Sequence, residues 1–264
     1  MNLYDKRITN NRKMSVLLNY KREGTGQPVV LIHGLFGDLN NLGVLARDLK
    51  QDFDVISIDL RNHGSSFHSD IHDYRSMAQD VSHLLTTLSI ESPIVIGHSM
   101  GGKVAMAVSE HYPIAKLVVL DMSPVKYTSR RHDNVIAGLN EVLKHPPSSR
   151  SEAMALLAQH VEMEGVRQFL GKSLFKRGDH LTWRFNVESL KSNYLDILDW
   201  IPITKTNVPI LFIKGGDSDY LTAEHQPLIQ AQFAHPKAHV IANTGHWLHA
   251  EKPTEVLRAI RKFI

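Results

Sequence analysis

The sequence predicts an α/β fold, with a mostly parallel central sheet flanked by helices and an all-helical cap inserted into the chain. In the first half, short apolar runs alternate with amphipathic helical stretches, the order that builds parallel sheets with right-handed crossovers. Between residues 129 and 198 no convincing strand is present, and the apolar spacing is helical. The strand pattern resumes after Pro202. A sheet interrupted once by a helical insert accounts for both observations.

Strands are expected where apolar runs end at turn-forming residues. The four apolar residues at 29–32 are typical of a strand buried on both faces of a parallel sheet. Asp59 and Asp121 each follow such a run, at the carboxyl end of the expected strand. The predicted strands cover residues 15–20, 29–32, 53–60, 94–96, 117–120, 208–213 and 239–242.

Helices are expected between these strands. Asn40 or Asn41 would cap a helix over 42–49. In the insert, Ser149 and Glu152 have the spacing of a capping box. The other predicted helices cover 77–88, a stretch after Met100, then 135–143, 154–161 and 166–174 in the insert, and finally 254–264.

These assignments divide the chain into three parts. Residues 1–13 are polar and are expected to form a disordered extension. The core is expected over 14–124 and 205–264, and the helical cap over 125–204. Long loops without secondary structure are rare, so an insert with its own helices is the better interpretation.

The composition excludes several kinds of site and partner. The 264 residues carry 30 Lys and Arg against 27 Asp and Glu, and this net charge of +3 gives no argument for nucleic-acid binding. Without cysteine, disulfides, thiol catalysis and cysteine metal sites are excluded. No apolar run approaches the roughly 18 residues of a membrane span. The first residues lack the apolar centre of a signal peptide, so a cytoplasmic location is expected.

Histidine is frequent, but its spacing does not indicate a metal site. The chain has 16 histidines and no HExxH motif. His68 and His72 are four residues apart without a supporting carboxylate pattern, so a solvated loop is the better interpretation. Neither a metal nor an organic cofactor is expected.

Residues 92–108 contain the pattern on which the functional hypothesis depends. An apolar run at 94–96 leads into Gly97-His98-Ser99-Met100-Gly101 and then a helix-compatible stretch. A Gly-x-Ser-x-Gly between strand and helix is typical of a nucleophile elbow, a strained turn that exposes the serine hydroxyl. Ser99 is therefore the candidate nucleophile.

The same stretch also fits a phosphate-binding loop. Residues 97–103 match Gly-x-x-x-x-Gly-Lys between a strand and a helix. That motif needs a hydroxyl at the next position to hold magnesium, and residue 104 is Val. The nucleophile elbow is therefore the better interpretation.

A serine nucleophile needs a base and a group that orients the base. His246 follows the last expected strand in a glycine-containing loop, and His249 is the alternative base. Three carboxylates follow earlier strands and are all candidates for the orienting acid: Asp121, Asp217 and Asp219. Residue types and spacing do not choose among them.

The loop after the first buried strand supplies the other half of the hypothesis. Acyl transfer develops negative charge on a carbonyl oxygen, and backbone N–H groups that stabilise it are worth about 2.7–4 kcal/mol each. In the elbow arrangement one comes from the residue after the nucleophile, Met100, and the other from the earlier loop, here Leu35. His33 is expected to brace this loop rather than to act as a base.

Together the motifs resemble a known family. The segments VLIHGLFG, DLRNHGSS, GHSMGGK, RRHD and AHVIANTGHWLHAEKP are similar to the YbfF-type bacterial esterases of the α/β-hydrolase superfamily, over about residues 15–264. The resemblance implies the α/β-hydrolase fold with a helical cap. It also implies hydrolysis of carboxylic and acyl-coenzyme A (thio)esters, with a small-molecule substrate.

The resemblance also assigns residues. It implies a catalytic group of Ser99, His246, Asp121 and the supporting Ser218, with Arg131 and Tyr220 as substrate anchors. Asp121 is favoured as the acid on this ground alone. This chain carries acidic residues at 217 and 219 where family members have Asn and Pro, so a role for the second of these stays open.

Other functions remain open for the same residues. C–C bond hydrolysis and cofactor-free perhydrolysis use the same kind of site, and a catalytically inactive hydrolase fold could bind a ligand. An aspartate at the elbow would indicate dehalogenase or epoxide hydrolase chemistry, and Ser99 argues against both.

Overall fold

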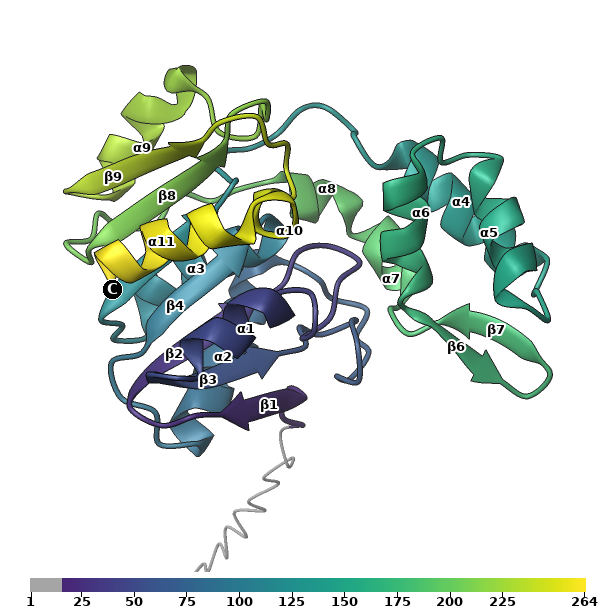
Figure 1. The fold of residues 1–264 in the computed structure, drawn as a ribbon, viewed down its shortest axis with the longest axis horizontal. Coiled ribbons are helices and arrows are strands. Elements are labelled where there is room, and N and C mark those ends of the chain that lie inside the picture. The colour runs from purple at the N-terminus through teal and green to yellow at the C-terminus, as the bar shows by residue number, and fades with distance from the viewer. Residues whose placement is uncertain (1–15) are drawn as a thin grey trace, which may run out of the picture.

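A seven-stranded sheet forms the centre of the computed structural model, which describes residues 16–264 (Figure 1). Its strand order is β1-β3-β2-β4-β5-β8-β9, and all neighbours are parallel except the β1–β3 pair. The strands are β1 (Tyr20–Glu23), β2 (Gln27–Ile32), β3 (Phe53–Ile58), β4 (Ile94–His98), β5 (Lys116–Leu120), β8 (Ile210–Gly215) and β9 (Pro236–Ile241). The predicted central sheet is therefore confirmed, while the predicted extension over residues 1–13 lies outside the described residues.

Apolar side chains on both faces hold the sheet between two helical layers. In β2, Val29 and Leu31 pack with one cluster and Val30 and Ile32 with the other, as expected for a strand buried on both sides. The first cluster contains helices α1 (Gly43–Leu49) and α11 (Pro253–Phe263), and the second contains α2 (Tyr74–Thr87), α3 (Met100–His111) and α9 (Gln226–Gln232). Two further short helices in the core are η1 (Ala223–His225) and α10 (Leu248–Glu251).

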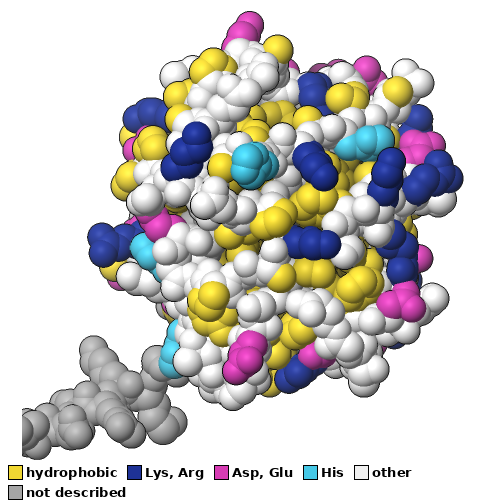
Figure 2. All heavy atoms as spheres, turned by 90° about the vertical axis from the view of Figure 1, so that its left-hand side faces the viewer, with side chains coloured by type: hydrophobic (Ala, Val, Ile, Leu, Met, Phe, Trp, Pro, Cys, Tyr) yellow, Lys and Arg dark blue, Asp and Glu magenta, His cyan; other side chains and the backbone are white. Residues whose placement is uncertain are grey.

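The sheet ends at β9, whose residues are mostly exposed. The face of the molecule that includes this edge shows hydrophobic side chains between lysines and arginines (Figure 2). Lys237 lies on the strand, and charge on an edge strand opposes pairing with another chain.

The inserted segment lies to one side of the sheet and is not all-helical (Figure 1). The expectation of an all-helical cap is wrong at 174–183, where two short strands form an antiparallel hairpin. Gly178, with φ of 62°, and Asp179 make its two-residue turn. The elements of the inserted segment are α4 (Asp133–Lys144), α5 (Arg150–Ala158), α6 (Glu164–Gly171), β6 (Leu174–Arg177), β7 (His180–Trp183), α7 (Val187–Ser192) and α8 (Tyr194–Leu198).

Several element boundaries also differ from the predictions. The predicted strand at 15–20 is displaced, because the paired segment is β1, which begins at Tyr20. Helix α1 is capped by neither Asn40 nor Asn41: Leu42 is its N-cap residue, and the Asn41 side chain accepts from the Asp38 N–H in the preceding turn. Ser149 does cap α5 by accepting from the Glu152 N–H. The division into core and cap stays a prediction.

Parallel strands place their carboxyl ends at one edge of the sheet, where open α/β folds bind ligands. Ser99 follows β4, Asp121 follows β5 and His246 follows β9. Residues 147 positions apart in the chain thereby reach one site. Within the described part of the chain, no helix is long and apolar enough to cross a membrane.

Replacing Gly101 by Ala will destabilise the protein. A Cβ at this position would lie 2.3 Å from the His33 carbonyl oxygen and 2.4 Å from that of Ile32, so α3 must move away from β2. We expect the free energy of unfolding to fall by at least about 2 kcal/mol, measured by urea denaturation. The matched control is Gly165→Ala in α6, where a Cβ meets nothing within 4 Å. Equal stability of the two variants would contradict the close packing of α3.

Candidate active site

Ser99 occupies a strained turn between β4 and α3. Its backbone has φ of 55° and ψ of −124°, a conformation that costs a non-glycine residue about 1–3 kcal/mol. The turn is tight because Gly97 and Gly101 have no side chain: a Cβ at Gly97 would lie 2.1 Å from the Gly101 carbonyl oxygen. The Ser99 N–H donates to the Leu120 carbonyl at 3.0 Å, which ties the turn to β5.

The structure brings His246 between Ser99 and Asp121. The His246 Nε2 lies 2.8 Å from the Ser99 Oγ, and the Nδ1 lies 2.7 Å from the Asp121 Oδ2. A carboxylate at Nδ1 fixes that nitrogen as a donor, and Nε2 then becomes the proton acceptor facing the hydroxyl. The predicted nucleophile and base therefore lie in hydrogen-bond contact.

Asp121 is fully buried, and hydrogen bonds satisfy its carboxylate. Its backbone φ is 50°, and its N–H donates to the Ile213 carbonyl at 2.8 Å. Its Oδ1 accepts from the Gly215 N–H at 3.0 Å, and its Oδ2 accepts from the Ser218 hydroxyl as well as from His246. Ser218, the supporting serine of the expected catalytic group, thus contacts the Asp121 carboxylate.

Asp217 and Asp219 do not contact His246 through a hydrogen bond. Asp217 is exposed, and Asp219, with 69% of its side chain exposed, pairs with Arg131 of the inserted segment. The Arg131 guanidinium holds the pKa of the Asp219 carboxyl below its usual value. Of the three candidate acids, the structure therefore places only Asp121 at the imidazole.

Tyr220 lies flat against His246. Their ring centroids are 3.9 Å apart, with an angle of 21° between the ring planes. The Arg131 guanidinium lies over the Tyr220 ring, 4.6 Å from its centroid. Burial raises the pKa of the Tyr220 hydroxyl to about 12, so it stays protonated near neutral pH. Arg131, Tyr220 and His246 form a continuous stack from the inserted segment to the imidazole.

Two buried histidines brace the loop after β2. The Leu60 N–H donates to the His33 Nε2 and the Phe36 N–H donates to the His63 Nε2, both at 3.1 Å. Burial lowers the pKa of both imidazoles, so they are neutral and their Nδ1–H groups donate to backbone carbonyls. His33 has the bracing contacts that the sequence predicted. His63 was not predicted, although it stands in one of the quoted motifs.

Leu35 and Met100, the residues expected to donate N–H groups to the oxyanion, line a cavity together with Ser99. The loop after β2 adjoins the elbow, since a Cβ on Gly34 would lie 3.2 Å from the Ser99 Cβ. Among the described residues, no partner accepts a hydrogen bond from the Leu35 or Met100 N–H. The first N–H groups of a helix have no intrahelical partner, which leaves that of Met100 available.

His249, the alternative base, contacts His98 and not Ser99. The two ring centroids are 4.3 Å apart, and the His98 Nε2 lies 2.8 Å from the His246 carbonyl oxygen. Burial lowers the pKa of His249 to about 4 and that of His98 well below its usual value, so both are neutral. The His98 ring, packed against that of His249, donates to the His246 carbonyl and so ties the His246 backbone to β4.

Two predictions outside this cluster are settled by burial. His72 does not lie in a solvated loop: it is fully buried, burial lowers its pKa to about 3, and its Nδ1 lies 3.3 Å from the Asn62 amide. His68 is exposed as expected. In the described part of the chain, no group of three potential ligands could hold a metal.

Lys103, the lysine of the competing phosphate-loop motif, faces the protein interior. It is fully buried, and its Nζ donates to the Leu198 and Asp199 carbonyl oxygens at 3.2 and 2.9 Å. The ammonium also lies over the rings of Tyr74 and Tyr127, at 5.1 and 4.8 Å from their centroids. Its hydrogen bonds are made within the protein, which speaks against the phosphate-loop interpretation.

Comparison with known proteins identifies the family. A model described as the alpha/beta hydrolase family matches residues 29–259. The chain belongs to the alpha/beta hydrolase family. This hydrolase is 46% identical over 246 residues to the esterase YbfF of Escherichia coli strain K12, covering 92% of this chain and 95% of that protein. The predicted resemblance to YbfF-type esterases is thereby confirmed.

Other relatives of this alpha/beta hydrolase include animal lipases and a marine esterase. It is 37% identical over 251 residues to the sn-1-specific diacylglycerol lipase ABHD11 of Xenopus laevis, covering 90% of this chain and 80% of the lipase. The solved structure of a marine microorganism esterase superimposes with a TM-score of 0.90 at 35% identity, covering 95% of this chain and all of the other.

The buried ammonium of Lys103 predicts a pH-dependent stability. Burial lowers the pKa of Lys103 to about 7, against 10.5 for an ordinary lysine. Between these values the unfolded chain binds more protons than the folded one, so stability rises with pH in this window. Relative to Lys103→Met, we expect the free energy of unfolding of the wild type to increase by up to about 1.4 kcal/mol per pH unit. Urea denaturation from pH 5 to 9 measures it, and a difference that stays constant with pH would contradict the lowered pKa of Lys103.

Proposed function

We propose that this protein is a serine hydrolase that cleaves carboxylic esters or thioesters through an acyl-enzyme on Ser99. The observation that carries the proposal is the position of His246, which contacts both the Ser99 hydroxyl and the buried Asp121 carboxylate. Relatives at 46% and 37% identity bear the names esterase and lipase, which supports ester hydrolysis as the reaction.

The first step is attack by Ser99 on the ester carbonyl carbon. His246 accepts the hydroxyl proton at Nε2 as the new C–O bond forms, and the imidazolium is stabilised by Asp121 at Nδ1. Asp121 remains a carboxylate in this step, because Gly215 and Ser218 donate to it. Ser218 is thus a positioning residue that acts through Asp121.

The oxyanion is held by the backbone. We assign the Leu35 and Met100 N–H groups as the donors that stabilise the negative charge developing on the carbonyl oxygen. The bracing of this loop by His33 and His63 supports the assignment, since preorganised donors need no rearrangement during the reaction.

Release of the two products completes the cycle. His246 gives its proton to the leaving oxygen or sulfur, and the C–O or C–S bond of the substrate breaks. A water molecule, deprotonated by His246, then attacks the acyl-enzyme and frees the acid and Ser99. Tyr220 stacks on the His246 ring and holds the imidazole in the plane that both proton transfers need. Tyr220 and Arg131 also line a cavity at Ser99, which supports their assignment as substrate-binding residues.

Acyl-coenzyme A thioesters remain our proposal for the substrate class, alongside oxygen esters. A thiol leaving group needs only the proton that His246 supplies. A panel of chromogenic esters and thioesters separates this reaction from C–C bond hydrolysis and perhydrolysis, because each gives different products from the same acyl group. The expected location remains cytoplasmic.

We predict that three substitutions separate the roles of the site residues. Ser99→Ala removes the nucleophile and abolishes labelling by a fluorophosphonate probe. Asp121→Asn leaves the geometry but favours the wrong imidazole tautomer, so kcat falls by about 10⁴. Asp219→Asn removes an exposed ion pair worth about 0–1 kcal/mol and lowers kcat/KM by less than about tenfold.

The measurements are p-nitrophenyl ester hydrolysis and intact-mass detection of the labelled serine. Circular dichroism checks that each variant is folded. A larger loss in Asp219→Asn than in Asp121→Asn would overturn the choice of acid. Failure of the wild type to be labelled or to cleave any ester would overturn the enzyme proposal and favour a ligand-binding role.

A further inference from the structure

Tyr220 lies in the irregular segment after β8, yet its backbone is fixed at both its N–H and its carbonyl. The Tyr220 carbonyl oxygen accepts from two hydroxyl groups, that of Tyr127 at 2.6 Å and that of Ser123 at 3.0 Å. The Tyr220 N–H donates to the Ser218 Oγ at 3.3 Å. Three hydrogen bonds therefore hold a residue that no strand or helix supports.

The two donors to the Tyr220 carbonyl come from the segment that also carries the acid. Ser123 and Tyr127 follow Asp121 closely in the chain, after β5. Asp121 contacts the Nδ1 of His246, and the Tyr220 ring stacks on the face of the same imidazole. The segment after β5 therefore acts on the imidazole twice, directly through the carboxylate and indirectly through the tyrosine ring.

The Tyr127 hydroxyl makes two hydrogen bonds at once. It donates to the Tyr220 carbonyl oxygen and accepts from the Ser123 N–H at 3.0 Å. Burial raises the pKa of this hydroxyl, so it stays protonated and remains a donor. A hydroxyl whose proton and lone pair are both used has one defined orientation, so Tyr127 holds the carbonyl in one direction.

Tyr127 is the stronger of the two donors to this carbonyl. The Ser123 hydroxyl has one proton and two neighbouring acceptors, the Tyr220 carbonyl oxygen and the His225 Nδ1 at 2.8 Å. The Tyr127 bond to the carbonyl is also the shorter one, at 2.6 Å against 3.0 Å. Loss of the Tyr127 hydroxyl should therefore release Tyr220 more than loss of the Ser123 hydroxyl.

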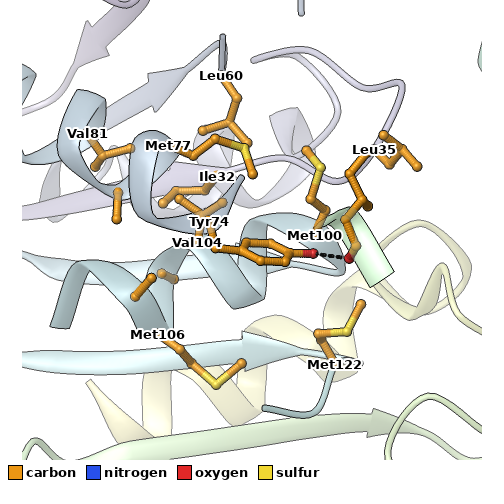
Figure 3. Packing of buried hydrophobic residues seen from close by; sticks show 14 of the residues in the cluster. Ile32, Leu35, Leu60, Tyr74, Met77, Val81, Met100, Val104, Met106 and Met122 are labelled. Carbon is orange, nitrogen blue, oxygen red and sulfur yellow. Dashed lines mark hydrogen bonds between the residues drawn. The ribbon is translucent and has the colours of Figure 1, made fainter. Parts of the chain in front are cut away.

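The rest of Tyr127 is anchored where the inserted segment returns to the core. Its N–H donates to the Leu198 carbonyl at 2.9 Å, and the Lys103 ammonium lies over its ring. The Tyr74 hydroxyl donates to the neighbouring Ile197 carbonyl at 2.6 Å, and Figure 3 shows this bond within the buried cluster. The end of α8 is thus tied to the core, and the Tyr127 side chain has a fixed support.

We propose that Tyr127 is a positioning residue for the reaction: its hydroxyl holds the Tyr220 ring against the imidazole of His246. The inference rests on the proposed serine hydrolase function and adds a residue to it. The two stacked rings are only 3.9 Å apart, so a turn of the Tyr220 backbone would remove the support from that face of the imidazole. With the support in place, the imidazole keeps its Nε2 directed at the Ser99 hydroxyl, 2.8 Å away.

The test is a double-mutant cycle between positions 127 and 220. Tyr127→Phe removes the hydroxyl and keeps the ring under Lys103. We expect kcat for p-nitrophenyl acetate to fall about threefold to tenfold, the effect of one neutral hydrogen bond. KM should change by less than about twofold, because acylation and deacylation both use the imidazole and slow together.

The second half of the cycle uses Tyr220→Ala, which keeps the backbone carbonyl and removes the ring. This variant should lower kcat by itself. In its background Tyr127→Phe should change kcat by less than about twofold, because no ring is left to position. A role in folding alone would give the same loss in both backgrounds.

Fluorophosphonate labelling of Ser99 gives a second readout. Its rate constant depends on the serine and the imidazole, and the probe needs no leaving alcohol of a substrate. Tyr127→Phe should lower this rate constant by the same factor as kcat, and the effect should again disappear in the Tyr220→Ala background.

Tyr112→Phe is the matched control. Tyr112 lies at the end of α3 opposite to the elbow, and its hydroxyl donates to the Ile90 carbonyl at 2.5 Å. The substitution removes the same kind of hydrogen bond, so it should lower stability to urea by a similar amount while kcat and the labelling rate stay at the wild-type values.

Each outcome decides the proposal. Wild-type kcat and labelling in a folded Tyr127→Phe variant overturn it, and so does an equal loss with and without the Tyr220 ring or an equal loss in Tyr112→Phe. If Tyr127→Phe does not fold, Ser123→Ala enters the same cycle, with a smaller loss that must also vanish in Tyr220→Ala. A wild type that is neither labelled nor able to cleave an ester rejects the serine hydrolase function, and this role with it.

Discussion

The close approach of α3 to the sheet is the constraint on which the site depends. Gly97 and Gly101 let the helix backbone touch β2 and β4 at distances that no Cβ would permit. The chain turns at Ser99 through a backbone conformation with φ of 55° and ψ of −124°, whose cost of about 1–3 kcal/mol is offset by the buried strands on either side. The same contact sets the start of α3 beside the loop after β2, so Ser99 and the Leu35 and Met100 N–H groups owe their positions to it.

Much of this arrangement could be predicted because it depends on local rules. Buried parallel strands need continuous apolar runs, and a strand-to-helix turn without side chains needs glycine. Both signals lie within a few residues, as at Val29 and Gly97. His246 was predictable for another reason: the carboxyl ends of parallel strands meet at one edge, so chain order places a residue after β9 beside one after β4.

The remaining features depend on contacts between distant segments. The choice of Asp121 over Asp219 follows from the partners of each carboxylate. Asp121 is buried and accepts from the Gly215 N–H, whereas Asp219 pairs with Arg131 of the inserted segment. Local spacing contains neither contact. The hairpin at 174–183 has strands of only four residues, and three of these eight residues are exposed, so its apolar pattern was too short to separate from helix. His72 is buried because other segments cover it.

The buried lysine of α3 ties the elbow helix to the end of the inserted segment. Lys103 finds its carbonyl acceptors only where the insert returns to the core, at Leu198 and Asp199. A chimera that replaced the insert with a shorter loop would leave an ammonium group without acceptors inside the protein, at a cost of several kcal/mol. Any change that moves the end of α8 must therefore also give the Lys103 ammonium other acceptors.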